Sequence, residues 1–299
     1  MSSNGTVTYF SKSWSDRIYR LIVYLFLFLF AFLCLFPFYI VVLNSFTPEP
    51  VIAGNGYQIF PSRLTLDAYS YLMRGPQLAR SYSVTITIVV FGTLLATIIT
   101  AMFAYTIAHP RVKHRNILAF ITYFAMLFGR PLVGFYMMIV NLMGIKNTLW
   151  ALTLPYLINP FFVFILVASF REFPFELSES AQIDGASDMR IFFVIAIPIT
   201  LPSIVTIALF YALLFWNDWW LSLLFIDVDR LHPLQMMLRQ LISQVNATRY
   251  VAGNVNLGPL PSNSLRMAVV CMTIGPILLV YPFIQRFFVK GISLGAVKG

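Results

Sequence analysis

The most distinctive polar residues of this chain are carboxylates grouped around one glycine, in a short segment between two long apolar runs. The motif consists of Glu176, Glu179, Ser180, Ala181, Asp184 and Gly185, followed by Ile195 and Pro198. A membrane chain has little reason to hold three carboxylates near one glycine and a proline unless the loop docks onto something. No metal-ligand spacing or catalytic cluster accompanies them. We therefore interpret the segment as a docking loop.

The spacing predicts that this loop forms a short helix, a turn and a second short helix. Phe173-Pro174 suits a helix start, because the fixed φ of proline matches the first helical turn. Glu176 and Glu179 are three residues apart, so they share a face near the helix N-terminus, where the dipole favours negative charge. Gly185 permits a tight reversal. The prolines that follow would kink the chain where it re-enters the membrane.

A second group of candidate residues lies inside a later apolar run, at Trp216-Asn217-Asp218-Trp219-Trp220. An ionisable residue within a span is costly and by default indicates a function. Indole faces can stack on sugar rings while amide and carboxylate groups bond the hydroxyls. Trp216, Asn217, Asp218 and Trp219 are therefore candidates for lining a translocation path. Two alternatives stay open: an aromatic belt at the membrane interface, and a helix cap or neighbouring-helix partner for Asp218.

Arg130 is a further candidate for this path, because it lies in Gly129-Arg130-Pro131 within another apolar run. Glycine and proline together would break the helix, and non-helical backbone at that depth must face protein or a water-filled cavity. The guanidinium then needs a carboxylate, a carbonyl or an anionic ligand. Pairing with Asp218 is one alternative. The other is a hypothesis that Arg130 favours acidic sugars.

The composition is that of a polytopic membrane protein. Of 299 residues, 59% are hydrophobic and 10% charged, with a mean hydropathy of +0.81, whereas soluble domains carry about a quarter charged residues. The net charge of +9 comes without the basic cluster that a nucleic-acid site needs. The chain also lacks a G-x-x-x-x-G-K-[ST] phosphate loop, so we do not expect it to hydrolyse ATP itself.

Six apolar stretches are long enough to cross a bilayer, which takes about 20 residues. They are Leu21–Leu43, Ser83–Ala108, Ile117–Met143, Leu149–Ser169, Ser203–Ile226 and Leu265–Phe288. The expected fold is an all-α integral membrane protein of six transmembrane helices. Its parts are an N-terminal segment 1–20, a transmembrane domain 21–290 and a C-terminal tail 291–299. Placing both termini in the cytoplasm puts eleven basic residues inside and eight outside, which weakly favours this orientation.

On this topology the segment between the last two spans is external. Its first half has apolar residues at helical spacing, which predicts a short interfacial helix from Leu234 to Ile242. Its second half is rich in glycine, asparagine and proline and is expected to be a loop.

The docking segment resembles the EAA loop of permease subunits in binding-protein-dependent ABC importers: Glu-Ala-Ala, three residues, Gly, nine residues, Ile-x-Leu-Pro. The chain departs from that pattern at Ser180 and Ile197, two small changes that keep the spacing. Its ending, from Tyr281-Pro282 to LGAVKG, is similar to the second permease of the carbohydrate-importer branch, as in maltose and oligosaccharide importers. The resemblance runs from the first span to the C-terminus.

This resemblance implies a function and a set of partners. The chain would be half of a heterodimeric pore that translocates a di- or oligosaccharide, with the loop between spans four and five acting as a cytoplasmic coupling helix. Partners would be a second permease, an ATPase dimer that binds ATP and Mg, and an extracytoplasmic solute-binding protein, all at a bacterial cytoplasmic membrane. We expect no cofactor or metal in this chain, and no nucleic acid.

The resemblance also implies that part of the loop between the last two spans contacts the binding protein. The residues expected there are Tyr250, Asn254, Asn256 and Pro259. The alternative class is a secondary transporter driven by an ion gradient. Such carriers often show repeated halves and paired intramembrane charges, and this chain offers only Arg130 and Asp218.

Overall fold

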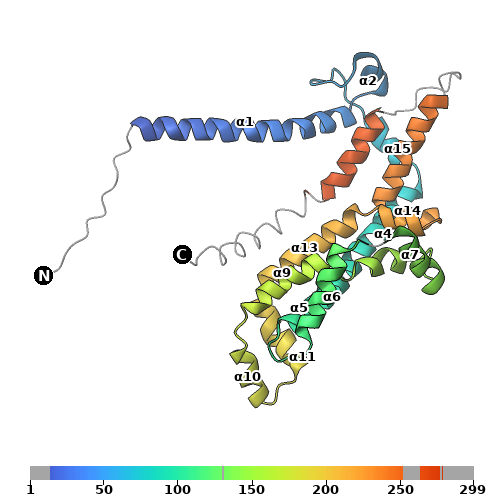
Figure 1. Ribbon diagram of the computed structural model, residues 1–299. Helices are drawn as coiled ribbons and strands as arrows, with labels where there is room; N and C mark the ends of the chain where they lie inside the picture. Colours follow the sequence, from blue (N-terminus) through green and yellow to red (C-terminus); the bar gives the residue numbers. More distant parts are fainter. Residues whose placement is uncertain (1–13, 130, 252–262, 277, 279–299) are drawn as a thin grey trace. The chain divides into compact units, whose positions relative to one another are not determined.

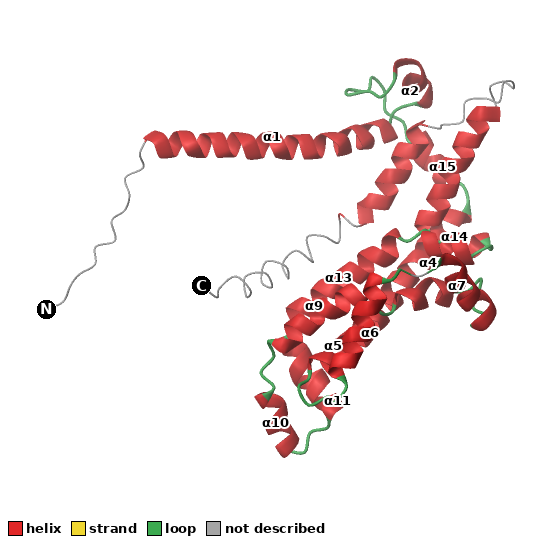
Figure 2. Cartoon of the chain, in the orientation of Figure 1, coloured by secondary structure: helices red, strands yellow, loops and turns green. Residues whose placement is uncertain are grey.

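The computed structural model describes residues 14–129, 131–251, 263–276 and 278, and these residues form helices joined by short loops (Figure 1). No strand occurs in this part of the chain (Figure 2). The chain divides into two compact units, Met1–Tyr71 with Leu257–Cys271, and Leu72–Asn256 with Met272–Gly299. The expected all-α fold is thus present.

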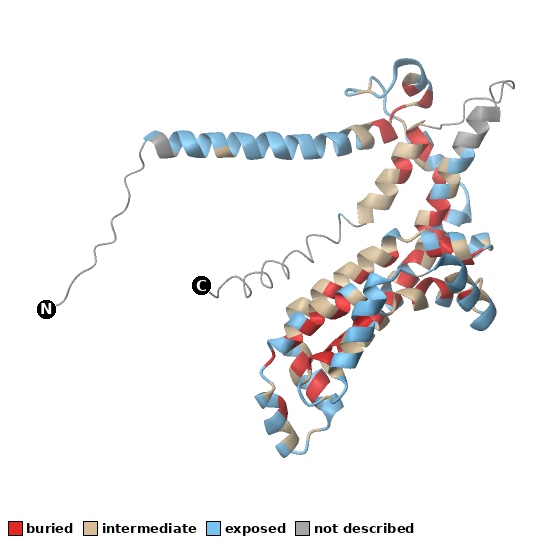
Figure 3. Ribbon diagram, viewed as in Figure 1, coloured by how far each residue is buried: buried red, intermediate tan, exposed pale blue. Residues whose placement is uncertain are grey.

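The first unit is dominated by α1 (Trp14–Ser45), whose apolar side chains are exposed along almost its whole length (Figure 3). Within Arg17–Ser45 an 18-residue window has a mean hydropathy of 2.8, and the helix is long and apolar enough to cross a membrane. An apolar helix without a covering partner is compatible with lipid, where the helix satisfies all of its own backbone groups. The helix covers the first expected span.

A buried carboxylate organises the rest of the first unit. Glu49 opens α2 (Glu49–Asn55) and is 8% exposed. Its two oxygens accept hydrogen bonds from Asn263 N and Nδ2 and from Ser264 N and Oγ, at 2.9 to 3.0 Å. Asn263 and Ser264 begin the helical residues 263–276. Glu49 therefore caps a helix 214 residues away in sequence, supplying the acceptor that the first N–H groups of a helix require.

Three helices form the core of the second unit: α5 (Thr93–Ala108), α9 (Pro160–Arg171) and α13 (Leu201–Asn217) (Figure 1). Ala96, Ala101 and Ala104 on α5 are fully or almost fully buried, and small side chains let helix backbones approach closely. Thr100 on α5 and Tyr211 on α13 share a buried hydroxyl hydrogen bond of 2.7 Å. Helix α5 continues α4 (Pro76–Thr87) through one wide helical turn, η1 (Ile88–Gly92).

Three further candidate spans are bent. Helix α6 (Arg115–Leu127) and the pair α7 (Leu132–Met137) and η2 (Met138–Leu142) meet at 114°. The pair α8 (Leu149–Thr153) and η3 (Leu154–Tyr156) meets α9 at 48°. Residues Asp188–Ile199 meet α13 at 88°.

Each break coincides with proline. Pro131 directly precedes α7, and Pro160 begins α9. Pro198 and Pro202 flank the break before α13. A proline removes a backbone donor and clashes with the preceding turn, so it ends one helix and suits the first turn of the next.

In the described part of the chain, two helices are long and apolar enough to cross a membrane. The number of candidate spans rises to five when each bent pair is counted as one span. The second half of the sixth expected span, Leu265–Phe288, lies outside the described residues except for Leu278, and its first half is helical. The fifth, expected to run to Ile226, ends earlier, at Asn217, and a separate α14 (Trp220–Phe225) follows. The turn η5 (Asp229–Leu231) and α15 (Leu234–Val251) complete the unit. A helix is therefore present over the predicted range from Leu234 to Ile242, and it continues to Val251.

Candidate functional site

The polar loop folds as a helix, a turn and a helix, as the spacing predicted. It consists of α10 (Glu176–Ile183) and α11 (Asp188–Ile191). Gly185 has a φ of +81°, a conformation that glycine adopts without steric cost. The turn is closed by Ala186 N donating to Ala181 O at 2.9 Å. One detail differs: α10 begins at Glu176, so Pro174 lies before the helix and not in its first turn.

Aromatic side chains fix the base of this loop to α5. Phe173, just after α9, is buried. The ring of Phe175 lies 4.9 Å from that of His109 and 6.3 Å from that of Tyr105, between ring centroids. His109 directly follows α5 and Tyr105 lies in its last turn. Packing of this kind orients α10 even though most of its own surface is polar.

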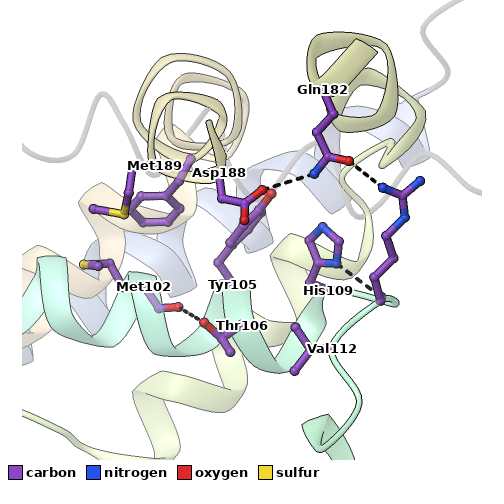
Figure 4. Close-up of a pocket in the computed structure, with 10 residues that line it drawn as sticks. Met102, Tyr105, Thr106, His109, Val112, Gln182, Asp188 and Met189 are labelled. Atoms are coloured by element: carbon purple, nitrogen blue, oxygen red, sulfur yellow. Dashed lines mark hydrogen bonds between the residues drawn. The ribbon is translucent and has the colours of Figure 1, made fainter. Parts of the chain in front are cut away.

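A chain of polar contacts continues from this base across the loop. Arg111 Nη2 lies 2.9 Å from Glu179 Oε1, and Arg111 Nη1 donates to Gln182 Oε1. Gln182 Nε2 in turn donates to Asp188 Oδ1 at 3.1 Å (Figure 4). Arg111 therefore contacts α10 at two points, and Gln182 connects α10 to α11.

Arg111 was not among the sequence candidates. Its only signal there was its place among the basic residues after span two. Its partner Gln182 is 71 residues away, so the contact depends on how α5 packs beside the loop.

These residues surround a cavity of about 390 Å³ between the end of α5 and the loop (Figure 4). Its lining is mostly apolar, with polar groups contributed by the residues just described. The lining residues are Met102, Tyr105, Thr106, His109, Arg111, Val112, Gln182, Asp188, Met189 and Phe192.

The surroundings of His109 favour its neutral form. Burial lowers the pKa of the imidazole below its usual value, and the nearby Arg111 guanidinium lowers it further, against smaller opposing effects of Asp188 and Glu179. Its Nδ1 accepts a hydrogen bond from Arg111 N at 3.2 Å. An imidazole can accept there only when that nitrogen carries no proton.

The outward side of the loop is polar with isolated apolar residues. Glu176, Ser180, Asp184 and Gly185 are exposed, and Ile183 is 88% exposed. Ala181 is half-buried, and Ser178 is the buried residue of α10. The arrangement has no nucleophile or general base poised over a substrate site. It offers instead an exposed surface of carboxylates with one exposed apolar side chain, Ile183.

The remaining motif residues lie on the chain that returns from this loop. Ile195 is in a wide helical turn, η4 (Phe192–Ala196), and Pro198 is in α12 (Ile197–Ile199). The 88° bend into α13 comes directly afterwards. The motif therefore contains both the exposed helix and the bend that connects it to a core span.

Asp218, from the second group of candidates, acts as a helix cap. Helix α13 ends at Asn217, and Asp218 Oδ2 accepts from Leu221 N in α14 at 3.2 Å. Its Oδ1 accepts from the Tyr156 hydroxyl at 2.8 Å. This corresponds to the structural alternative left open by the sequence.

The neighbours of Asp218 use their polar groups in different contacts. Asn217 Nδ2 donates to Leu213 O at 2.8 Å, and Trp216 Nε1 donates to Thr273 O at 3.3 Å. The Trp219 ring lies 3.6 Å from the Arg239 guanidinium carbon.

The other candidates fall at or beyond the limits of the described chain. Arg130, Asn254, Asn256 and Pro259 lie outside the described residues. Tyr250 belongs to α15, and its side chain is not described. Among the residues that are described, no group of three or more His, Cys, Asp or Glu side chains could hold a metal ion.

Comparison with known proteins gives a consistent result. Residues 96–294 match the family described as binding-protein-dependent transport system inner membrane component. The protein LplC of Bacillus subtilis (strain 168) is 39% identical over 95% of this chain and 96% of its own length. The polygalacturonan/rhamnogalacturonan transport system permease protein YtcP of the same organism is 35% identical over 95% and 99%.

A solved structure shares the fold. It is a crystal structure of a bacterial ABC transporter involved in the import of the acidic polysaccharide alginate, with a TM-score of 0.82 and 26% identity. The match covers 92% of this chain and 98% of that one. The resemblance inferred from the EAA-like loop is thus confirmed, and the chain belongs to the family of binding-protein-dependent transport system inner membrane components, the permease subunits of ABC importers.

Proposed function

We propose that this permease imports a di- or oligosaccharide as the second membrane subunit of an ATP-driven transporter. A second permease completes the pore, and an extracytoplasmic binding protein delivers the sugar. Two ATPase subunits bind ATP and Mg on the cytoplasmic side. The observation that carries the proposal is the exposed loop α10–α11, which presents carboxylates on one side and is joined to core spans on the other.

In this proposal α10 is the coupling helix, and it inserts into a groove of an ATPase subunit. Closure of the ATPase pair on ATP moves α10, and the movement reaches the spans through the covalent connections to α9 and α13. The central cavity then opens outward to receive sugar. Six spans with both termini in the cytoplasm place this loop on the ATPase side, in agreement with the basic residues counted on that face.

The names of two similar proteins favour an acidic oligosaccharide as the substrate of this permease. One relative is named for polygalacturonan and rhamnogalacturonan transport, and the similar solved transporter imports an acidic polysaccharide. A carboxylated sugar needs a cation along its path, and a guanidinium binds carboxylates with two parallel hydrogen bonds. Arg130 remains the proposed cation on sequence grounds. The binding protein would contact the segment that contains Tyr250, Asn254, Asn256 and Pro259.

A charge reversal on the coupling helix tests this function. The complex of both permeases and the ATPase would be purified with wild-type subunit, with Glu179→Lys, and with Glu172→Lys as the control. Glu172 is an exposed carboxylate at the end of α9, outside the helix-turn-helix. We expect Glu179→Lys to release the ATPase, or to abolish stimulation of ATP hydrolysis by sugar-loaded binding protein. Unchanged assembly and stimulation in Glu179→Lys would refute the coupling role.

None of the comparisons favours the alternative of a carrier driven by an ion gradient.

A further inference from the structure

We propose that Arg111 is a positioning residue that transmits movement of the coupling helix to α5, the one core span that is not continuous in sequence with the loop. This inference rests on the proposed coupling role of α10. It adds a side-chain route to the two covalent routes through α9 and α13.

The chain joins two of the three core helices to the loop, but it does not join α5 to the loop. Helix α9 leads into α10, and α11 leads through η4 and α12 to α13. Both spans follow the loop because the chain joins them. Helix α5 ends at Ala108, far earlier in the sequence, and it packs against α9 and α13 in the core. Contacts between the end of α5 and the loop add to this packing, so that α5 is held to the loop directly as well as through its neighbours.

Arg111 makes these contacts from a fixed position. Its backbone N–H is bound to His109 Nδ1 at 3.2 Å, and His109 is the residue that caps α5. The His109 ring packs on Phe175 at 4.9 Å. The base of the Arg111 side chain is thus tied to α5, and its guanidinium reaches the loop.

The guanidinium binds two residues one helical turn apart on α10. One is Glu179, at 2.9 Å, and the other is Gln182. The planar fork of arginine suits this two-point contact, whereas the ammonium of lysine is a single point charge. Gln182 passes the contact on to Asp188 at 3.1 Å (Figure 4), so α10 and α11 are held together. The result is a continuous polar connection from α5 to both helices of the loop.

The small contribution of an exposed ion pair to folding stability distinguishes a role in transmission from a role in stabilising the fold. Both Arg111 and Glu179 side chains are 55% exposed, and ion pairs this exposed contribute little to folding stability. Loss of Arg111 should therefore leave the fold intact. Its effect should show in energy transmission, that is, in how much sugar moves for each ATP hydrolysed.

The experiment uses the whole transporter in proteoliposomes, with both permeases, the ATPase pair and sugar-loaded binding protein. Variants are Arg111→Gln, Arg111→Lys and the control Lys113→Gln. Lys113 is an exposed residue of the segment between α5 and α6, which also contains Arg111. The measured quantities are ATPase retained in the complex and sugar transported per ATP hydrolysed. We expect Arg111→Gln to retain the ATPase but to lower the transport ratio by about fivefold or more, as for coupling between distant sites. Arg111→Lys should recover part of it, and Lys113→Gln should match wild type.

Three outcomes would overturn the inference: an unchanged transport ratio in Arg111→Gln, loss of the ATPase from that complex, or an equal fall in the Lys113→Gln control. The first would show that the covalent routes suffice, and the second that Arg111 acts in docking. The Glu179→Lys experiment decides the coupling role separately. A defect there combined with normal Arg111→Gln would leave the proposed function standing.

Discussion

At the scale of single residues, the polar side chains of this permease serve to connect helices. Glu49 joins α2 to the start of helical residues 263–276, Asp218 caps α14, and Arg111 joins the end of α5 to α10. In an apolar chain a polar group is stable only where it finds a partner. Each of these residues therefore fixes a junction that apolar packing alone would leave loose.

Removal of the Glu49 carboxylate should destabilise the protein measurably. Glu49→Ala leaves the N–H groups of Asn263 and Ser264 without their acceptor in a mostly buried site. The expected loss is about 1–3 kcal/mol, the cost of stranding buried hydrogen-bonding groups. Thermal unfolding of the detergent-purified protein measures it. Asp67→Ala, at an exposed carboxylate of the same unit, is the control, and an equal effect of both substitutions would contradict the capping role.

His109 should make the loop junction sensitive to acid. Its pKa is lowered in the folded protein, chiefly by burial and then by Arg111, so the folded state resists a proton that the unfolded chain accepts. The stabilising contribution of neutral His109 is therefore full above about pH 6.5, the ordinary imidazole pKa, and is lost as pH falls below it. Protonation of Nδ1 would also break its hydrogen bond with Arg111 N.

The measurement is thermal stability of wild type and His109→Gln across this pH range. Glutamine does not titrate, so the variant should lose less stability than wild type on acidification. Parallel pH profiles for the two proteins would show that His109 does not titrate at this junction.

At the scale of elements, close packing of the core spans sets the geometry that the loop must follow. Gly92 lies in the wide turn η1, beside Phe215 of α13. A Cβ placed on Gly92 would lie 2.9 Å from the Phe215 ring, which is buried. Glycine therefore suits this position, because any larger side chain would collide with the Phe215 ring.

Gly92→Ala should overpack this contact and destabilise the protein by about 1–3 kcal/mol. Phe215→Leu in the same chain should relieve part of that loss, because it removes the ring that the new methyl group meets. A double-mutant cycle measured by thermal unfolding gives the coupling between the two positions. Strictly additive effects would mean that the ring moves aside at no cost.

The sequence predicted elements best where their signals are local. The carboxylates around Gly185 predicted the helix, turn and helix of the loop, and the prolines predicted the bend before α13. The break at Asp218 was not predicted, because a short polar interruption barely lowers the hydropathy of a long apolar window. The role of Arg111 was not predictable either, since its partners are distant in sequence and only packing brings them together.

At the scale of the whole molecule, the preference for acidic over neutral sugars is the property that we assign to Arg130. If its guanidinium binds sugar carboxylates, Arg130→Met should reduce uptake of acidic oligosaccharides while neutral ones of equal length are unaffected. The expected reduction is about tenfold, the equivalent of one charge-assisted hydrogen bond. Competitive uptake of oligogalacturonides and neutral oligosaccharides by cells carrying each variant measures it. Unchanged uptake of both classes would exclude this role.

The central claim is that ATP hydrolysis, passed through the loop α10–α11, drives sugar import through this subunit. The most direct test is uptake of labelled oligogalacturonide by proteoliposomes that contain both permeases and the ATPase, with binding protein outside and ATP inside. Uptake should require ATP and binding protein, should persist when ionophores remove all ion gradients, and should fail in Glu179→Lys. Uptake that needs an ion gradient and proceeds without ATP would contradict the account.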